Sequence, residues 1–480
     1  MENTNSSIFK KFPRTFWIAN TVELLERWSW YGLFVVLAIY LTKSRDTGAL
    51  GFTQIQKGSM MGTISAMVYF LPIFTGAIAD KIGYKISLLI AFTLYFTGFV
   101  LMGNLTSYYA VYIAFAIVGL GAAIFKPIIS ATIAKTTTSE TSSIGFGIFY
   151  MMVNIGAFIG PIVASKLREL DWIYVFYVSA AVISVNMVLV FLFFEEPNRE
   201  KNTDSLSKSF TEIAKNISEV LQDFKFLVFL ILIIGFWTMY LQLFFTMPVF
   251  IEQWVDTTSM YDYIANISPW FASIVGTKEG TVAAEMIINT DALFIIAFQI
   301  LVSTIVMKLK PLNTMISGIL VAAIGVGLMF IFNNPFFIIA AILIFSLGEM
   351  ASSPKITEYI GRIAPADKKG LYMGMSFLPL AGGNFLAGYL SGNIYGTMSD
   401  KINLLKNEFT SHDWQIPEQT EIFTKNDFLA LGCEKLGMSS QELTNYLWDT
   451  YHPSNIWYIF TAIGMITVVG LWIYDKTIIK

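Results

Sequence analysis

Twelve stretches of this chain are long and apolar enough to cross a lipid bilayer, and this feature restricts its fold more than any other. A spanning helix needs about 20 mostly apolar residues, because ~30 Å of hydrocarbon is crossed at about 1.5 Å per residue. The first stretch is too long and too charged for a cleavable signal, so we expect it to remain as a helix. The twelve lie near 15–42, 54–79, 86–104, 108–134, 144–165, 173–194, 226–250, 291–307, 312–332, 335–357, 370–396 and 456–474.

The composition agrees with an all-helical membrane protein and excludes a water-soluble enzyme. Hydrophobic residues make up 55% of the 480 residues and charged residues 14%, against about 25% charged in soluble chains. The net charge of -3 offers no basic surface for nucleic acid. Cys433 is the single cysteine, so it can form neither an intramolecular disulfide nor a thiolate metal cluster. No cofactor and no metal are expected.

The basic residues predict the orientation of the spans, because cytoplasmic loops carry an excess of Lys and Arg. With the N-terminus inside, 18 basic residues fall in cytoplasmic segments, 10 in outer segments and 3 within spans. Both termini are therefore expected in the cytoplasm of a multi-pass protein, most simply in a bacterial inner membrane.

The loops divide the chain into two halves of six spans each. We expect an N-terminal bundle over residues 1–194, a polar and partly helical cytoplasmic linker over 195–225, and a C-terminal bundle over 226–480. The C-terminal half also contains two long outer loops, at about 255–290 and 397–455.

The 397–455 loop is predicted to contain short helices, because Ser439 and Glu442 have the spacing of a capping box. The loop also holds both histidines of the chain, His412 and His452. No spacing typical of metal ligands is present, and we interpret the loop as a solvated cap.

Ionisable residues inside spans are the most informative side chains, because each costs several kcal/mol in hydrocarbon unless it is paired or faces water. In the first span, side chains at offsets 0, 3, 4, 7, 8 and 11 form one helical stripe. This stripe consists of Glu23, Glu26, Arg27, Trp30, Tyr31 and Phe34. The charges in other spans include Lys126, which precedes Pro127, as well as Asp291 and Glu349.

Two interpretations of these charges compete. They could be a structural network of ion pairs that holds helices together and has no further role. They could instead line a water-filled cavity in which carboxylates change protonation as a solute passes, with Arg27 and Lys126 tuning their proton affinity. We favour the second, because charges deep in helical membrane bundles usually mark a transport path.

The sequence GAIADKIGYK, which ends the second span, indicates a short loop stabilised by charges. Its glycines permit a tight turn, and its aspartate can cap or pair at a helix end. It also resembles the major facilitator signature at Gly76, Asp80, Gly83 and Lys85, although Tyr84 stands where that pattern usually has a basic residue. The corresponding place in the second half, MKLKPL, keeps only the basic character.

Several motifs together resemble the proton-dependent oligopeptide transporters of the major facilitator superfamily. ELLERWSWYG resembles the family's E-x-x-E-R-F-x-Y-Y-G motif, IFKPIIS its F-K-P-N segment, and FYMMVNIGAF its F-Y-x-x-I-N-x-G-S signature. LGEMASSPK and APADKKGLYMGMSFLPLAGGNFLAG are similar to its tenth and eleventh spans. The resemblance implies a major facilitator fold, with twelve transmembrane helices in two six-helix bundles around a central site. It also implies a proton-coupled symporter that imports di- and tripeptides by alternating access.

The resemblance further implies roles for individual residues. Proton coupling would fall to Glu23, Glu26, Arg27 and Lys126, with the lysine paired to the first-span acids. Arg27 and Lys126 would hold the carboxylate of the peptide, and Glu349 its amino group. The implied substrate-binding set is Arg27, Trp30, Tyr31, Tyr69, Lys126, Asn154, Trp237, Asp291 and Glu349. The expected partners are a small peptide, protons and the lipid bilayer, with no nucleic acid, and a monomer is expected.

The chain also departs from the family pattern. Leu241 replaces the gating glutamate of the seventh span, Phe34 replaces an arginine, and Asp291 stands where the family has asparagine. Ser376 and Ile128 replace a tryptophan and an asparagine. A carrier for a non-peptide zwitterionic or cationic solute, with altered coupling, is therefore an alternative. A membrane enzyme or receptor acting through the 397–455 loop is disfavoured, because that loop shows no nucleophile-base spacing.

Overall fold

The computed structural model of the protein describes residues 8–138, 140–197, 206–365 and 368–478, and every regular element in this part of the chain is a helix apart from one isolated bridge between Gly276 and Val282. Helices are the expected solution, because a helix satisfies its own backbone polar groups where no water can. The predicted all-α class is confirmed. Among these residues ten helices are long and apolar enough to cross a membrane, or up to eleven if a bent pair forms one span.

Contacts within the chain define two compact units. Unit 1 comprises Met1–Leu33, Met67–Arg168 and Ile173–Glu219, and unit 2 comprises Phe34–Ala66, Glu169–Trp172 and Val220–Lys480. Residues 34–66, which the sequence prediction assigns to the N-terminal bundle, group by their contacts with unit 2. The predicted division of the chain at the 195–225 linker stays a prediction.

Unit 1 contains the first half of α1 and most of the N-terminal helices. In it α4 packs against α5, and α3 lies against both. The linker helix α8 confirms that residues 195–225 are partly helical, and its Phe210 ring lies 6.1 Å from the Phe74 ring. The helices are α1 (Arg14–Thr42), α3 (Pro72–Ile82), α4 (Tyr84–Asn104), α5 (Tyr108–Lys135), α6 (Ser142–Arg168), α7 (Trp172–Phe193) and α8 (Leu206–Leu221).

The second predicted span is bent. Helix α2 (Gln54–Phe70) stops at Leu71, and α3 restarts at Pro72 at an angle of 49°. Proline causes the break, because its ring lacks the backbone N–H and clashes with the preceding turn.

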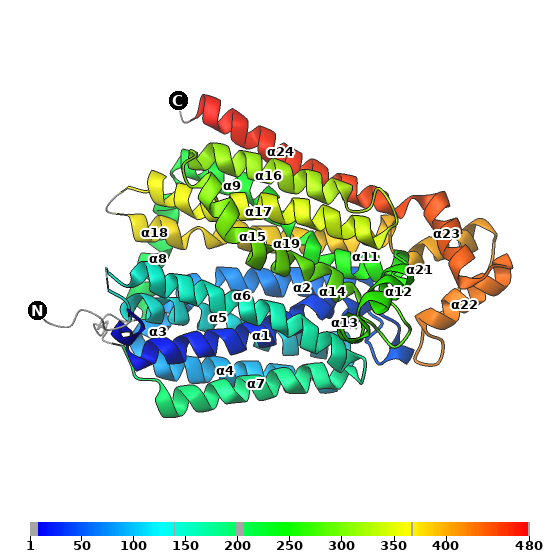
Figure 1. Ribbon diagram of the computed structural model, residues 1–480, viewed down its shortest axis with the longest axis horizontal. Helices are drawn as coiled ribbons and strands as arrows, with labels where there is room; N and C mark the ends of the chain where they lie inside the picture. The colour runs from blue at the N-terminus through cyan, green and yellow to red at the C-terminus, as the bar shows by residue number, and fades with distance from the viewer. Residues whose placement is uncertain (1–7, 139, 198–205, 366–367, 479–480) are drawn as a thin grey trace, which may run out of the picture. The chain divides into compact units, whose positions relative to one another are not determined.

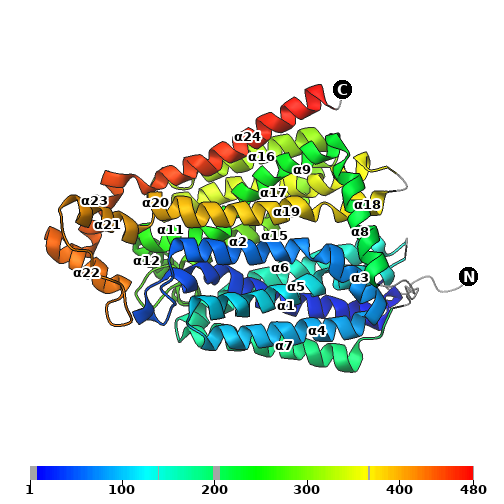
Figure 2. The same ribbon diagram turned by 180° about the vertical axis from the view of Figure 1, so that it is seen from behind.

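Unit 2 contains the helices of the second half of the chain. Helix α16 packs against both α17 and α24, as Figures 1 and 2 show, and α9 packs against α19 and α24. The helices after the linker are α9 (Phe224–Tyr240), α10 (Gln242–Phe245), α11 (Met247–Trp254), α12 (Thr258–Ile267), α13 (Pro269–Val275), α14 (Ala284–Ile288), α15 (Thr290–Val306), α16 (Pro311–Leu328), α17 (Pro335–Ile363), α18 (Lys369–Gly374), α19 (Phe377–Tyr389), α20 (Tyr395–Met398) and α24 (Ile456–Thr477).

Two predicted spans of this unit are interrupted. The 226–250 stretch consists of α9, α10 and α11, with breaks at Leu241 and Thr246. The 370–396 stretch consists of α18, α19, a π-helical turn over Leu390–Ile394, and α20. No helix in the second stretch reaches the length of a span by itself, so the count of twelve stays a prediction.

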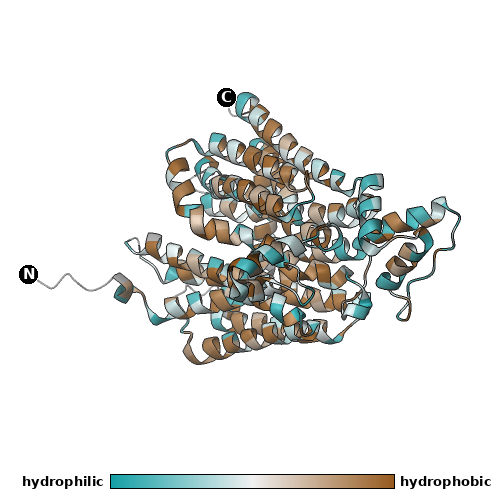
Figure 3. Ribbon diagram, turned by 45° about the vertical axis from the view of Figure 1, so that its right-hand side comes forward, coloured by the Kyte–Doolittle hydropathy of each residue, from teal (hydrophilic) through white to brown (hydrophobic). Residues whose placement is uncertain are grey.

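The predicted helices of the 397–455 loop are confirmed as α21 (Lys401–Ser411), α22 (Lys425–Leu436) and α23 (Ser440–Tyr451), drawn in orange in Figure 1. The predicted capping box of Ser439 and Glu442 begins α23. In Figure 3 these helices carry more hydrophilic residues than the long helices do.

Candidate functional site

The charged stripe of α1 folds into a buried ion-pair cluster in unit 1. The Arg27 guanidinium pairs with both acids of its own helix, with Nε 3.3 Å from Glu23 Oε1 and Nη2 2.5 Å from Glu26 Oε2. The spacing explains this arrangement, because residues four apart face the same side of a helix. All three side chains are buried. One arginine therefore neutralises part of a site that holds two carboxylates.

Tyr95 of α4 completes this cluster, and sequence reasoning missed it. Its hydroxyl donates a hydrogen bond to Glu26 Oε1, and the whole tyrosine side chain is buried. Tyr95 lies in the apolar run FTLYFTG, where a single tyrosine gives no signal of a polar contact. Glu26 thus accepts hydrogen bonds from both Arg27 and Tyr95.

Lys126 of α5 lies in the same unit, but it does not pair with the first-span acids. Its Nζ is 4.0 Å from the centre of the Tyr69 ring. Among the described residues no ion pair joins it to Glu23 or Glu26, although it interacts electrostatically with both. The cation is thus held on an aromatic face in this conformation.

The other predicted residues of unit 1 have varied surroundings. Trp30 is buried and stacks at 6.4 Å on Phe115 of α5. The Tyr31 ring lies 5.8 Å from the guanidinium carbon of Arg27. Asn154 of α6 donates its amide to the backbone carbonyl of Tyr150 at 2.8 Å. The structure therefore brings Tyr31 to the ion-pair cluster and gives Asn154 a local backbone partner.

Unit 2 contains a second acidic cluster. Asp291 of α15 is buried, and Oγ of Ser346 on α17 lies 2.5 Å from its Oδ1. Glu349 follows Ser346 by three residues and interacts electrostatically with Asp291. The hydroxyl of Tyr240 donates a hydrogen bond to Glu349. The sequence signal that could have identified Ser346 is its position three residues before Glu349, because residues three apart lie on the same face of a helix.

The remaining predicted residue of unit 2, Trp237, lies next to this cluster along α9. Its ring is 5.3 Å from that of Tyr240 in an edge-to-face arrangement. Leu241 is buried at the end of α9. Phe34 packs against Phe245, with ring centres 5.9 Å apart. Apolar packing therefore occupies both positions where the family pattern has charged residues.

Two further departures have local roles. The hydroxyl of Ser376 donates to the carbonyl of Met373 at 2.6 Å, at the break between α18 and α19. Ile128 is buried in α5.

The predicted signature residues lie in and beside the turn between α3 and α4. Gly83 has a φ of 110°, which favours glycine, so this residue allows the turn between the two helices. The Tyr84 hydroxyl donates to Asp80 at 2.9 Å and accepts from Lys135 Nζ at 3.0 Å. Tyr84 thus connects an acid to a base at the position where the signature usually has a basic residue.

The same turn is hydrogen-bonded to the residues that follow α7. The Glu196 carboxylate accepts the backbone N–H groups of Tyr84 at 2.7 Å and Lys85 at 3.0 Å, which caps α4. Lys85 Nζ donates to the Phe194 carbonyl at 3.1 Å. Gly76, in α3, faces the side chain of Pro127.

A glycine seam joins α2 to α19 and the π-helical turn in unit 2. A Cβ on Gly58 would lie 2.6 Å from the Gly392 Cα, and one on Gly62 would lie 2.9 Å from the Gly388 Cα. Both helices therefore carry the G-x-x-x-G pattern that permits close approach of backbones. Beside the seam, buried Lys57 donates to the Phe245 carbonyl at 3.0 Å. Sequence reasoning singled out neither feature.

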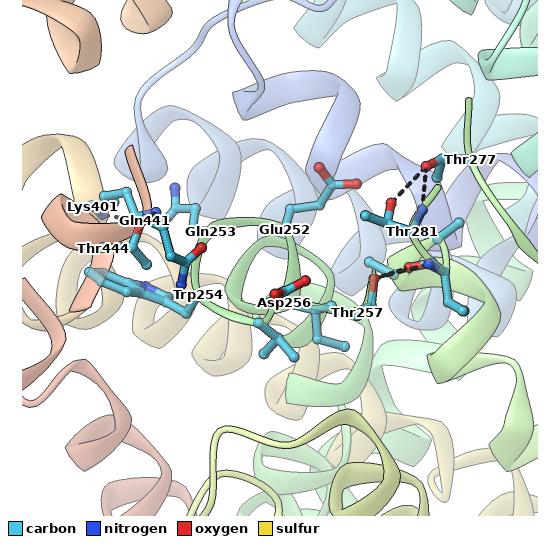
Figure 4. A pocket seen from close by; sticks show the side chains of 15 residues that line it. Glu252, Gln253, Trp254, Asp256, Thr257, Thr277, Thr281, Lys401, Gln441 and Thr444 are labelled. Atoms are coloured by element: carbon cyan, nitrogen blue, oxygen red, sulfur yellow. Dashed lines mark hydrogen bonds between the residues drawn. The ribbon is translucent and has the colours of Figure 1, made fainter. Parts of the chain in front are cut away.

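A polar cavity of about 240 Å³ lies beside α11 and the 397–455 segment. Figure 4 shows Glu252, Asp256, Lys401 and Thr444 around it. Lys401 Nζ donates to Thr444 Oγ1 at 2.9 Å, and burial lowers the pKa of this lysine to about 8. None of the site residues predicted from the sequence lines this cavity.

Lys425 fastens α22 to the segment between α1 and α2. Its Nζ donates to the backbone carbonyls of Thr42 at 2.7 Å and Phe52 at 2.8 Å. Burial lowers the pKa of this lysine to about 8. A half-buried cation thus connects the 397–455 segment to residues 42–52, within unit 2.

Comparison with known proteins identifies the family. The model of the Major Facilitator Superfamily matches residues 21–375. The multidrug resistance protein MdtH of Photorhabdus laumondii is 24% identical over 367 residues, which cover 76% of this chain and 84% of that protein. The uncharacterized transporter YclF of Bacillus subtilis is 27% identical over 214 residues, 41% of this chain and 42% of that protein.

Solved structures show the same fold. A transporter of the POT family in complex with 5-aminolevulinic acid superimposes with a TM-score of 0.69 at 17% identity, covering 97% of this chain and 98% of that chain. The nucleoside transporter NupG, in a variant form, superimposes with a TM-score of 0.64 at 12% identity, covering 96% and 99%. The predicted likeness to the oligopeptide transporters is thus confirmed at the level of the fold. The protein belongs to the Major Facilitator Superfamily and is a multi-pass membrane transporter rather than an enzyme.

Proposed function

We propose that this transporter is a proton-coupled symporter that imports di- and tripeptides. The observation that carries the proposal is the buried cluster of Glu23, Glu26, Arg27 and Tyr95, together with Lys126 on the face of Tyr69. Two buried carboxylates, a buried arginine and a half-buried lysine in one membrane unit are the chemistry that a site for protons and a charged solute requires.

Proton binding would change the partners of Arg27. In the described conformation Glu26 accepts from Arg27 and Tyr95, and Glu23 is the second partner of the arginine. A proton on either glutamate weakens its ion pair, so that the guanidinium can turn to a solute carboxylate. Lys126 can leave the ring of Tyr69 for the same carboxylate at small cost, because a cation–π contact is worth about 0.5–2 kcal/mol.

The acids of unit 2 would recognise the other charge of a zwitterionic solute. Glu349 Oε2 is buried and has no hydrogen-bond partner among the described residues. A protonated amino group supplies the donor that this oxygen lacks. A solute that interacts differently with the two conformations of the carrier then shifts their populations, which is what alternating access needs.

The test is uptake of labelled di- and tripeptides into proteoliposomes with an imposed pH gradient. We expect uptake to depend on the gradient in the wild type. Lys126→Ala and Glu26→Gln should lose driven uptake, and retained exchange in these variants would assign the two residues to coupling rather than to binding. Lys308→Ala, which changes an exposed lysine outside the cluster, is the control. Uptake that is indifferent to the gradient contradicts proton coupling.

A non-peptide zwitterionic or cationic solute is the second candidate. Buried Leu241 and buried Asp291 favour it, because they change the charge that the family pattern places in this unit. One solved transporter of similar fold is in complex with 5-aminolevulinic acid, which has an amino and a carboxyl group but is no peptide. A thermal-shift screen of peptides against other charged solutes separates the two candidates, and stabilisation by no peptide favours the second.

A further inference from the structure

Two acidic side chains meet in unit 2 without a basic partner. Asp291 belongs to α15 and Glu349 to α17, and these helices pack against one another. Among the described residues no lysine or arginine forms an ion pair with either acid. Two neighbouring buried carboxylates cannot both carry a charge at low cost, so such pairs usually retain a proton.

No lysine or arginine among the described residues acts electrostatically on either acid. Tyr240 of α9 donates to Glu349, and Glu285 of α14 is a further buried acid. Lys355 is six residues beyond Glu349 on α17, and it is paired with Glu358 at 2.7 Å. Helix α16, which also packs against α17, reads PLNTMISGILVAAIGVGL and contains no ionisable side chain.

The geometry of Ser346 indicates which acid holds the proton. Its Oγ lies 2.5 Å from Asp291 Oδ1 and 2.8 Å from the carbonyl oxygen of Ile342, one turn earlier in α17. A serine hydroxyl has one hydrogen, and in a helix it commonly donates that hydrogen to the carbonyl four residues earlier. The short distance between Ser346 Oγ and Asp291 Oδ1 is then a hydrogen bond if the Asp291 carboxyl group carries a proton and donates it to Ser346 Oγ.

We propose that Asp291 is protonated in this conformation and that Asp291 and Glu349 share one dissociable proton. In this state the Asp291 O–H donates to Ser346 Oγ, and the Ser346 O–H donates to the Ile342 carbonyl. When the proton leaves to water, the serine hydrogen turns to the new carboxylate. The pair then changes from one negative charge to two.

This proton site would replace the titratable group that is absent at Leu241. Leu241 directly follows Tyr240, whose hydroxyl contacts Glu349, so the pair lies close to the position of the missing glutamate. An ammonium group at Glu349 neutralises the single negative charge of the protonated pair. The role in transport rests on the proposed function, whereas the proton itself can be detected without any solute.

The first experiment is infrared spectroscopy of the purified full-length protein at neutral pH, which detects the C=O stretch of a protonated carboxyl group. We expect the wild type to show this band and Asp291→Asn to lose it. Asp262→Asn, which changes an exposed aspartate of α12, is the matched control and should retain the band. A band that survives both Asp291→Asn and Glu349→Gln would overturn the proposal.

A second variant keeps this test decisive should Asp291→Asn fail to fold. Ser346→Ala removes the acceptor of the carboxyl proton and leaves the acid in place. We expect the band to remain and to shift in frequency. An unshifted band in Ser346→Ala would place the proton elsewhere and contradict the assignment.

The second experiment measures transport. We expect Asp291→Asn to reduce gradient-driven uptake by about tenfold or more. Adding Leu241→Glu to Asp291→Asn should restore part of the gradient dependence, because it returns a titratable group to α9. If a sodium gradient drives uptake as effectively as a proton gradient does, the role of the Asp291–Glu349 pair in proton coupling is overturned. If the wild type takes up no peptide, only the proposed substrate is affected.

Discussion

Lys126 rests on the ring of Tyr69, with its Nζ 4.0 Å from the ring centre, and leaves Arg27 as the ion-pair partner of Glu23 and Glu26. The two cations therefore have different roles. Arg27 neutralises the acids, and Lys126 is left for the proposed contact with a solute. The Tyr69 ring is therefore expected to keep Lys126 from collapsing onto the carboxylates.

Replacing the ring of Tyr69 tests this role. Tyr69→Leu removes an interaction of about 0.5–2 kcal/mol that keeps Lys126 away from Glu23 and Glu26. The lysine is then expected to pair with these acids instead of the solute, so KM for a solute with a free carboxylate should rise, by up to about 30-fold. Tyr69→Phe keeps the aromatic face and should remain close to the wild type. The control is Tyr109→Leu, at a position that is 79% exposed. Equal effects of the Leu and Phe variants would show that the ring face is not the relevant feature.

Removing the Tyr95 hydroxyl should destabilise the protein. In Tyr95→Phe the buried Glu26 loses a hydrogen-bond donor, and an unsatisfied buried polar group costs about 1–3 kcal/mol. We expect a lower melting temperature in detergent. Tyr177→Phe is the matched control, because the Tyr177 hydroxyl bonds Asn104 in an exposed position, and it should change stability by less than about 0.5 kcal/mol. A Tyr95→Phe variant as stable as this control would contradict the contact.

The glycine seam should not tolerate a methyl group. In Gly62→Ala the new Cβ would lie 2.9 Å from the Gly388 Cα, so the helices must shift. Overpacking of this kind costs about 1–3 kcal/mol, and thermal unfolding should report the loss. Gly374→Ala is the control, because a Cβ there would meet nothing within 4 Å. If Gly62→Ala and Gly374→Ala unfold at the same temperature, α2 and α19 are farther apart than described.

The stability of the 397–455 segment should depend on pH through Lys425. Burial lowers the pKa of this lysine from 10.5 to about 8 in the folded protein. Between these two pKa values the unfolded chain binds more protons than the folded chain, so the free energy of unfolding rises with pH. Below pH 8 the lysine is charged in both states, and the full cost of burying the charge is present. We therefore expect the melting temperature of the wild type, relative to Lys425→Met, to rise between about pH 8 and pH 10.5. Lys435→Met, at an exposed position of α22, should show no such trend.

The charged stripe of α1 and the order of the long helices were predictable, because both follow from residue spacing along one chain. Tyr95 was not, because its contact with Glu26 depends on the packing of α4 beside α1. The sequence also placed Lys126 in an ion pair, whereas the tertiary position of Tyr69 gives it an aromatic partner. The interruptions of the 226–250 and 370–396 stretches were missed, because hydropathy measures length and apolarity but not backbone continuity.

The backbone of α2 lies close to the backbone of α19 and the π-helical turn where glycines face one another at Gly58, Gly62, Gly388 and Gly392. Side chains that interlock must change rotamer before two helices can separate, and this raises the barrier to their motion. A surface of glycines has no rotamers to change. We therefore expect a low kinetic barrier to the separation of these two helices, and the hydrogen bond from the Lys57 ammonium to the Phe245 carbonyl lies beside the same surface.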